Sequence, residues 1–426
     1  MNATPLLPVA AATPVAGPPA RFARPRAGVP ILRAASLALA PLLALAPLLA
    51  YAPPAAGQCR YTAITFRGPD DPVFGPPATT ATGINNHNQV VGYYFIADGP
   101  ETGFVWSEAT GLVPLPPAPG GVRPADINDA GLIVGSMGSS PGRGFLWDGE
   151  QYIELGVPDW GTYSNPRAIN DEGVVVGTWG GGQGNPYEAF VWRDGVATGL
   201  GSTLGTPRSI AEDITDDSRV AGWMGGAQTV NGQAYVFDEP SVLQLGPVPG
   251  GFTSEARGMN DRAQVCGFGR VPQPNFGIHA FAWMGGAFHV FEPFEGLRAN
   301  RANDMNAWGQ VVGTGSEGNP RGFTWRDGVL YDLEELVDPP MVLANHTPWA
   351  INERGVIAGG GQGGAIVLFP QDPPGDIDVD CRVDLKDLLL LLLDFGCMGE
   401  ECVGDVNQDG QTSLPDLAIL LSNWSP

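Results

Sequence analysis

The chain of 426 residues is poor in positive charge: 22 Lys and Arg stand against 45 Asp and Glu, a formal net charge of −23. This balance argues against nucleic acid as a partner, because a phosphate backbone needs a basic face. Lys386 is the single lysine, so lysine chemistry has one candidate. The four histidines lack metal-ligand spacing and predict no catalytic or metal-binding site. They are His87, His279, His289 and His346.

Glycine and proline are abundant, with 61 Gly and 41 Pro, which approaches the composition of disordered chains. However, 43% of the residues are hydrophobic and 9% are aromatic, and this content favours a packed core. A loop-rich all-β protein satisfies both observations.

Residues 1–57 indicate a signal peptide or export segment. They contain four arginines and no acidic residue, an apolar run from Ala34 to Ala52, and small residues up to Gly57. This is the order of a secretory signal. We expect cleavage near Gly57 and a secreted, extracellular or cell-surface location. A start codon placed too far upstream and a retained membrane anchor are alternatives. No later run reaches about 18 apolar residues, so we expect no membrane attachment after cleavage.

An oxidising compartment permits disulfides, but five cysteines cannot all pair within one chain. One disulfide could join Cys397 to Cys402, or one could use Cys381. The sequence leaves this choice open.

Residues 58–370 form a repeat array. An Ile or Met followed by polar residues recurs seven times at steps of 42 to 46 residues, and a glycine stands eight residues after each. The anchors are Ile84, Ile127, Ile169, Ile214, Met259, Met305 and Ile351. The glycines are Gly92, Gly135, Gly177, Gly222, Gly267, Gly313 and Gly359.

Each repeat predicts four strands. In the second copy, two apolar runs flank Asn128-Asp129-Ala130-Gly131, where Gly131 suits the positive φ of a hairpin turn, and a second hairpin follows with the turn Asp148-Gly149. Four strands in about 45 residues predict a blade of a β-propeller. The last repeat lacks a fourth strand, and the orphan segment 60–66 can supply it by pairing with 365–369, which closes seven blades. An open β-solenoid is the alternative.

The repeats resemble the HAF-type extracellular repeat of bacterial exported proteins. The His-Ala-Phe triplet is present once, as His279-Ala280-Phe281, and the other copies lack the histidine. The resemblance spans about residues 59 to 370. It implies an exported binding protein and brings no catalytic chemistry.

Residues 371–426 contain two twelve-residue acidic loops, 376–387 and 405–416, which are 29 residues apart. Calcium takes six to eight oxygen ligands, which such a loop supplies from positions 1, 3, 5, 7, 9 and 12. Both loops place oxygen-bearing residues accordingly and predict two Ca²⁺ sites. Helices are expected only after the loops, over 388–395 and 417–424, because Pro373-Pro374-Gly375 precede the first loop and Gly404 precedes the second.

Paired loops with exiting helices resemble a type I dockerin over about residues 375 to 424. The resemblance implies two ligand sets and a cohesin-like or other cell-surface protein as partner. The first set is Asp376, Asp378, Asp380, Arg382 (carbonyl), Asp384 and Asp387. The second is Asp405, Asn407, Asp409, Gln411 (carbonyl), Ser413 and Asp416.

The first loop departs from the dockerin pattern. Cys381 replaces the turn glycine at position 6, which costs about 1 kcal/mol if its φ is positive and makes the first site the weaker one. Leu385-Lys386 and Leu414-Pro415 stand where dockerins carry small hydroxyl residues, so familiar cohesin specificity is not expected. The leucine run 388–393 is either a buried helix or an exposed docking face.

The sequence shows no catalytic constellation. Repeated tryptophans such as Trp106 and Trp147 are expected in the blade core. Aromatic residues shortly after a repeat glycine are candidates for a shallow sugar- or peptide-binding platform: Tyr93, Tyr94, Trp179 and Trp223. We therefore expect an exported non-catalytic binding or assembly protein. The alternatives are a polysaccharide-degrading enzyme of a dockerin-linked complex and a structural cell-surface protein.

Overall fold

The computed structural model describes residues 59–424 apart from 71–76, 96–98, 140–141, 182–186, 207, 226–231, 273–276, 296, 298, 317–319, 342, 344, 362, 400–401 and 408. The export segment predicted at 1–57 lies outside the described residues. Among the helices of the described part, none is long and apolar enough to cross a membrane.

Each sequence repeat folds as an antiparallel unit of four strands, with the first strand made by the residues before the Ile or Met anchor. The first two units contain β2 (Thr79–Ile84), β3 (Val90–Tyr94), β4 (Thr102–Ser107) and β5 (Gly111–Pro114), then β6 (Val122–Ile127), β7 (Ile133–Met137), β8 (Arg143–Trp147) and β9 (Tyr152–Glu154). The next two contain β10 (Tyr163–Ile169), β11 (Val175–Gly180), β12 (Tyr187–Arg193) and β13 (Val196–Gly199), then β14 (Ser209–Ile214), β15 (Val220–Met224), β16 (Gln233–Asp238) and β17 (Ser241–Gly246).

The later units follow the same order. They contain β18 (Glu255–Met259), β19 (Val265–Val271), β20 (Gly277–Met284) and β21 (Ala287–Val290), then β22 (Ala299–Met305), β23 (Val311–Ser316), β24 (Arg321–Arg326) and β25 (Val329–Asp332), and last β26 (His346–Ile351), β27 (Ile357–Gly361) and β28 (Gly364–Pro370). Two four-residue helices, α1 (Gly201–Leu204) and α2 (Leu333–Leu336), follow fourth strands. Neighbouring units also pair at two places, β2 with β27 and β20 with β22.

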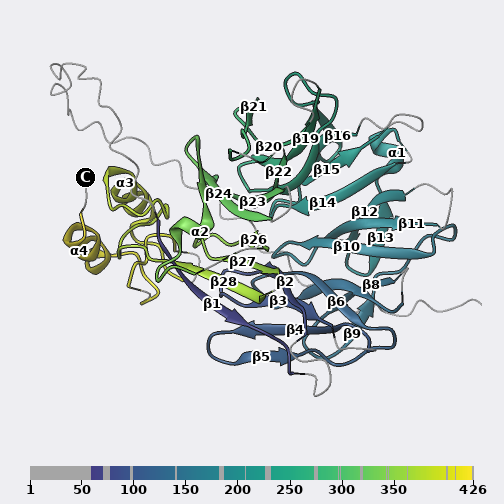
Figure 1. Ribbon diagram of the computed structural model, residues 1–426, viewed down its shortest axis with the longest axis horizontal. Coiled ribbons are helices and arrows are strands. Elements are labelled where there is room, and N and C mark those ends of the chain that lie inside the picture. Colours follow the sequence, from purple (N-terminus) through teal and green to yellow (C-terminus); the bar gives the residue numbers. More distant parts are fainter. Residues whose placement is uncertain are drawn as a thin grey trace, which may run out of the picture. The chain divides into compact units, whose positions relative to one another are not determined.

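The segment before the first repeat completes the last unit. Strand β1 (Tyr61–Phe66) pairs antiparallel with β28 in the register Tyr61↔Pro370 to Phe66↔Ala365 (Figure 1). The predicted pairing of 60–66 with 365–369 is therefore confirmed.

The first strands of all units lie against one another in a closed sequence, in which β26 also lies beside β2. In all units but the fourth, which has Thr215, an asparagine after the anchor links the unit to the next. The Asn85 amide donates to the Asn128 carbonyl at 3.0 Å, Asn128 to Asn170 at 3.0 Å, and Asn352 returns to Asn85 at 3.0 Å. The same asparagine oxygen accepts the N–H four residues on, as Asn128 does from Leu132. One side chain thus closes its own turn and holds the neighbouring unit.

The turn geometry agrees with the sequence prediction. Gly131 has φ of 79°, and Ser218 and Ala263 take positive φ at the same place in their units. The glycines eight residues after the anchors recur for a different reason, which is close approach of the opposing strand. A Cβ on Gly92 would lie 2.0 Å from the carbonyl oxygen of Thr80, and a Cβ on Gly267 would lie 2.0 Å from that of Glu255. Only glycine allows the two strands to approach so closely.

The units pack through aromatic and aliphatic side chains on their facing sides. The recurrent third-strand phenylalanines are fully buried: Phe104, Phe145, Phe190, Phe281 and Phe323. Trp106 and Trp147 are also buried. This confirms the expected core role of these two tryptophans.

Helices α3 (Leu385–Asp394) and α4 (Leu414–Ser422) follow the two acidic loops. They begin three residues earlier than predicted, because Asp384 with Asp387, and Ser413 with Asp416, form capping boxes that start each helix inside its loop. Cys397 pairs with Cys402, and Cys59 pairs with Cys381. Cys266 is free and buried.

Replacing a linking asparagine tests its double role. We expect Asn128→Ala to lower the free energy of unfolding by about 1–3 kcal/mol, because the Leu132 N–H and the Asn170 carbonyl both lose a buried partner. Asn128→Thr should cost less, since Thr215 serves naturally at this position and accepts the Arg219 N–H at 3.0 Å. Urea unfolding measures both, and equal effects of the two variants would contradict the proposed double role.

Candidate functional site

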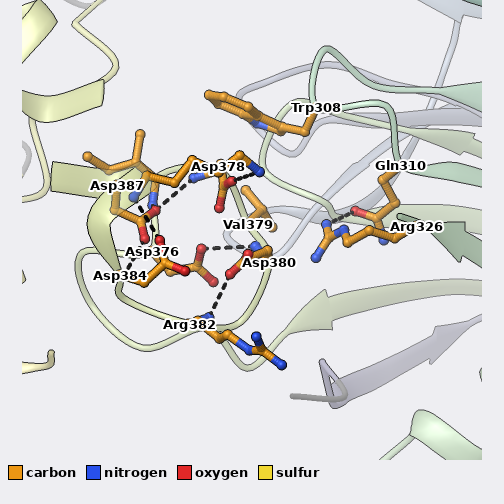
Figure 2. A network of polar contacts seen from close by, with 12 residues as sticks. Trp308, Gln310, Arg326, Asp376, Asp378, Val379, Asp380, Arg382, Asp384 and Asp387 are labelled. Atoms are coloured by element: carbon orange, nitrogen blue, oxygen red, sulfur yellow. Dashed lines mark hydrogen bonds and ion pairs between the residues drawn. The ribbon is translucent and has the colours of Figure 1, made fainter. Parts of the chain in front are cut away.

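The first acidic loop, residues 376–387, is organised by two of its carboxylates. The Asp376 carboxylate accepts the N–H groups of Asp380 and Cys381, at 2.9 and 2.5 Å. The Asp387 carboxylate accepts the N–H groups of Ile377, Asp378 and Asp384, at 2.7, 3.2 and 2.8 Å. Loop positions 1 and 12 thereby hold the loop closed around its own side chains (Figure 2).

The second loop, residues 405–416, repeats this arrangement. Asp405 accepts from the N–H groups of Asp409 and Gly410, at 3.0 and 2.7 Å. Asp416 accepts from those of Asn407 and Ser413, at 3.0 and 2.8 Å. Positions 1, 5 and 6, and positions 3, 9 and 12, therefore make equivalent hydrogen bonds in both loops, although the sequences differ at most other positions.

Position 6 requires a left-handed backbone in both loops. Gly410 has φ of 86° and Cys381 has φ of 65°. Because the φ of Cys381 is positive, the backbone cost predicted for a non-glycine residue at this position applies. The disulfide with Cys59, which lies just before β1, holds Cys381 in place.

Carboxylates crowd the first loop. Oxygens of Asp376, Asp378 and Asp387 all lie within 4.8 Å of one another (Figure 2). Burial and the neighbouring carboxylates of Asp372, Asp387 and Asp380 raise the pKa of Asp376 to about 8. Burial and Asp378 raise the pKa of Asp380 to about 6. These groups would be stabilised by a cation among them.

Lys386 supplies one positive charge to this group of carboxylates. Its ammonium forms an ion pair with Asp378, whose side chain is 1% exposed. Among the described residues, no other hydrogen-bond donor meets that carboxylate. The corresponding residue of the second loop is Pro415, and Asn407 stands in place of Asp378. Sequence reasoning did not predict this ion pair, although it singled out Lys386 as the one lysine of the chain.

The loop also packs against the repeat domain. Trp308 belongs to the same apolar cluster as Ile377, Val383, Leu391 and Leu420. Gly355 approaches Val379 so closely that a Cβ on the glycine would lie 2.7 Å from the valine Cγ1.

The leucine run 388–393 is buried on one side and exposed on the other, and a docking role for the exposed side stays a prediction. Leu391 is fully buried in the cluster with Leu420, whereas Leu389, Leu392 and Leu393 are exposed, the last at 85%.

A second candidate lies where the first strands meet, in a cavity of about 170 Å³ lined by asparagine and acidic residues. Acidic residues two positions after the anchors each accept an N–H from the preceding unit. Asp129 N–H donates to Asp171 at 2.8 Å, Asp171 to Asp216 at 3.0 Å, and Asp216 to Asp261 at 3.0 Å. Among the described residues that line the cavity there is no histidine, cysteine, serine or lysine.

Three further aspartates line this cavity from alternate units. Asp126, Asp213 and Asp304 accept the N–H groups of Ile169, Met259 and Ile351, at 3.0, 2.6 and 2.8 Å. Sequence reasoning missed them. Their signal is the residue before each anchor, which alternates between a small residue and aspartate: Gly83, Asp126, Ala168, Asp213, Gly258, Asp304 and Ala350.

Burial raises the pKa of Asp126 to about 6 and that of Asp304 to about 7. Burial also raises the pKa of Asp213 well above its usual value, with Asp304 adding to the effect. The cavity therefore holds carboxylates that are only partly charged near neutral pH.

No protein-family model matches the chain, and neither does any curated protein. Solved structures do match. An oligogalacturonate lyase from Vibrio parahaemolyticus has a TM-score of 0.50 at 10% identity over 73% of this chain and 97% of that one. A streptogramin B lyase has 0.46 at 10% identity, over 73% and 98%. The β-propeller domain of the Trilobed protease from Pyrococcus furiosus has 0.43 at 14%, over 67% and 98%.

The fold is a β-propeller. The similarity extends to the fold alone, since every identity is far below 25%.

The propeller places the four predicted ligand-binding aromatics in unlike surroundings. Tyr94 and Trp179 are 3% and 5% exposed and belong to the core between units. Tyr93 is half-buried against Phe95, and Trp223 is half-buried against Tyr187 at 5.8 Å between ring centroids. Of the four predicted platform residues, Tyr93 and Trp223 thus remain partly accessible. The ligand of such a platform stays a prediction.

We expect the stability of the propeller to change with pH through Asp126, Asp213 and Asp304, which we call the axial carboxylates. The ordinary pKa of aspartate is 3.8, so between this value and about 6 or 7 the folded propeller holds protons that the unfolded chain has lost. These bound protons stabilise the folded state at low pH. The stabilisation disappears as the pH rises through the pKa values of the folded protein. We expect the unfolding temperature to fall between about pH 5 and about pH 8. The corresponding loss in the free energy of unfolding is about 1–3 kcal/mol.

Asp126→Asn with Asp304→Asn should flatten this slope, while the exposed Asp194→Asn should leave it unchanged. Thermal unfolding across pH measures the slope, which is the readout even if the amides lower absolute stability. An unaltered slope in the double variant would disprove the assignment.

Proposed function

We propose that this chain is an exported, non-catalytic binding or assembly protein. Its seven-bladed propeller, closed by β1, supplies a recognition surface, and its dockerin-like tail supplies Ca²⁺-dependent attachment to a cohesin-like or other cell-surface protein. The observation that carries the proposal is the equivalent hydrogen-bond pattern of loops 376–387 and 405–416. Two loops of unlike sequence share the framework that a twelve-residue calcium loop needs.

The donor set fits a hard cation. Carboxylates of Asp376, Asp378 and Asp387 gather around one point, and the raised pKa values of Asp376 and Asp380 mark negative charge that lacks a counter-ion. Asp380 and Asp384, with the Arg382 carbonyl, would complete the first set. Asp405, Asn407, Asp409, Ser413 and Asp416, with the Gln411 carbonyl, would form the second. Calcium would hold each loop and its exiting helix together.

Two further features support export and a binding role. The disulfides Cys59–Cys381 and Cys397–Cys402 are compatible with an oxidising compartment. The exposed Leu389, Leu392 and Leu393 leave apolar surface on α3 for a partner.

Calcium should stabilise the full chain. A ligand at a hundred times its Kd adds about 2.7 kcal/mol of stability, so Ca²⁺ should raise the transition temperature of the tail relative to EDTA. Asp387→Asn with Asp416→Asn should abolish this shift, because both loops lose their position-12 carboxylate. Glu108→Gln with Glu150→Gln removes the same charge from exposed propeller sites and should preserve the shift. Scanning calorimetry decides, and a calcium-independent transition in the unaltered chain would sink the proposal.

Lys386 should weaken the first site. Its ammonium competes with Ca²⁺ for Asp378, and a partly buried charge pair of about 1–2 kcal/mol corresponds to roughly tenfold in affinity. Lys386→Gln should therefore tighten the first site and leave the second unchanged, whereas Lys386→Arg should resemble the unaltered chain. Two-site titration calorimetry measures both constants, with Asp405→Asn used to isolate the first. A weaker first site in Lys386→Gln would show that the lysine assists binding.

A further inference from the structure

Charged residues from three successive units meet on the first strands β10, β14 and β18. Arg167, Glu212 and Arg257 each stand two residues before their anchor. Glu212, whose side chain is 6% exposed, forms ion pairs with both arginines, at 3.7 Å to Arg167 and 3.3 Å to Arg257. The glutamate thus fixes a guanidinium on either side of it.

Phe268 holds two guanidinium groups beside this triad. The Cζ atom of Arg257 lies 5.4 Å from the centroid of its ring, and that of Arg301, from the next unit, lies 5.2 Å from it. Phe268 is itself 6% exposed and so serves as a support for the arginines. Glu255 lies opposite Phe268 on the neighbouring strand, and Arg270, whose N–H donates to Thr253 Oγ1, acts with Glu255 on the charge of Arg301. We call Arg167, Arg257, Arg270 and Arg301, with Glu212 and Glu255, the arginine cluster.

The cluster has more positive than negative charge, four arginines against two glutamates, in a chain whose formal net charge is −23. Among the described residues the structure records no ion pair for Arg270 or Arg301. Burial and the neighbouring Arg257 lower the pKa of Arg301, although Glu255 opposes them. An anion would relieve this repulsion.

Aromatic surface adjoins the cluster. The N–H of Ser254, next to Glu255, donates to the Gly232 carbonyl at 3.1 Å, and a Cβ on Gly232 would lie 3.0 Å from the Trp223 ring. Tyr187 packs edge-on against Trp223. Both rings are half-buried, so part of each remains accessible. Aromatic rings beside guanidinium groups suit a ligand that has apolar C–H faces and carboxylates, which is the chemistry of an acidic sugar.

We propose that the arginine cluster, together with Tyr187 and Trp223, binds a short acidic oligosaccharide through its uronate carboxylates. The proposal rests on the propeller being a recognition surface and names the ligand class of that surface. A small cluster in a strongly acidic chain suits a few carboxylates, whereas a long polyanion would be repelled by the remaining surface.

The test is titration calorimetry on the full chain with uronate trisaccharides of glucuronate, galacturonate and mannuronate, and with glucose trisaccharide as the neutral probe. We expect at least one uronate trisaccharide to bind about tenfold or more tightly than the neutral one, with affinity falling as salt is added. Arg301→Gln should reduce this affinity about tenfold, and Arg301→Lys should restore part of it, because a lysine keeps the charge without the planar fork.

Arg143→Gln is the matched control, since Arg143 is an exposed arginine of another unit that pairs with Glu154. It should leave binding unchanged, and thermal unfolding verifies that each variant is folded. Equal losses in Arg143→Gln and Arg301→Gln would overturn the site. Absence of binding to all three uronates would overturn it too, as would equally tight binding of inorganic phosphate or a triglutamate peptide.

Titrations are run both with Ca²⁺ and with EDTA. Uronate binding that persists in EDTA supports the cluster independently of the tail. Calcium-dependent stabilisation without uronate binding would leave the attachment role intact and reject this ligand, so the two failures are distinguishable.

Discussion

The structure depends on a hydrogen bond that no repeat can make alone. Each linking asparagine closes its own turn with its oxygen and donates its amide to a carbonyl of the next unit, as Asn128 does to Asn170. Where Thr215 interrupts the series, Arg219 donates to the Asp261 carbonyl of the following unit at 2.8 Å. Where Ala307 offers no carboxylate, Arg262 lies over Trp308 instead. At both positions where the repeat residue is replaced, another contact joins the same two units.

The sequence predicted features that depend on local turns and on spacing. The positive φ of Gly131, the four strands per repeat and the frame of loops 376–387 and 405–416 all follow from residues within a few positions of one another. The β1–β28 pairing was predictable because an incomplete last repeat needs a strand. The Cys59–Cys381 bond, the burial of Trp179 and the arginine cluster were not, because they depend on which surfaces of distant segments face each other.

Excess negative charge is accommodated in three different ways. Around the axis, the carboxylates of Asp171 and Asp216 each accept a backbone N–H of the preceding unit. On the first strands β10, β14 and β18, guanidinium groups from two units pair with Glu212. In the first acidic loop, a single ammonium faces five aspartates, which leaves charge uncompensated. Raised pKa values are found at both places, because burial opposes the charged form of Asp376 as it does that of Asp126.

The two loops share a framework but differ in surroundings, and this asymmetry bears on how the tail could act. The first loop is bonded to the start of β1 through Cys381 and packs Val379 against Gly355 of the repeat domain. The second carries Gly410 and Pro415 at the positions of Cys381 and Lys386 and has no such tie. The disulfide of the first loop leads to Cys59, just before the strand that completes the last unit. The repeat domain therefore constrains the first loop directly, at positions 4 and 6, whereas in the second loop a glycine alone supplies the left-handed backbone of position 6.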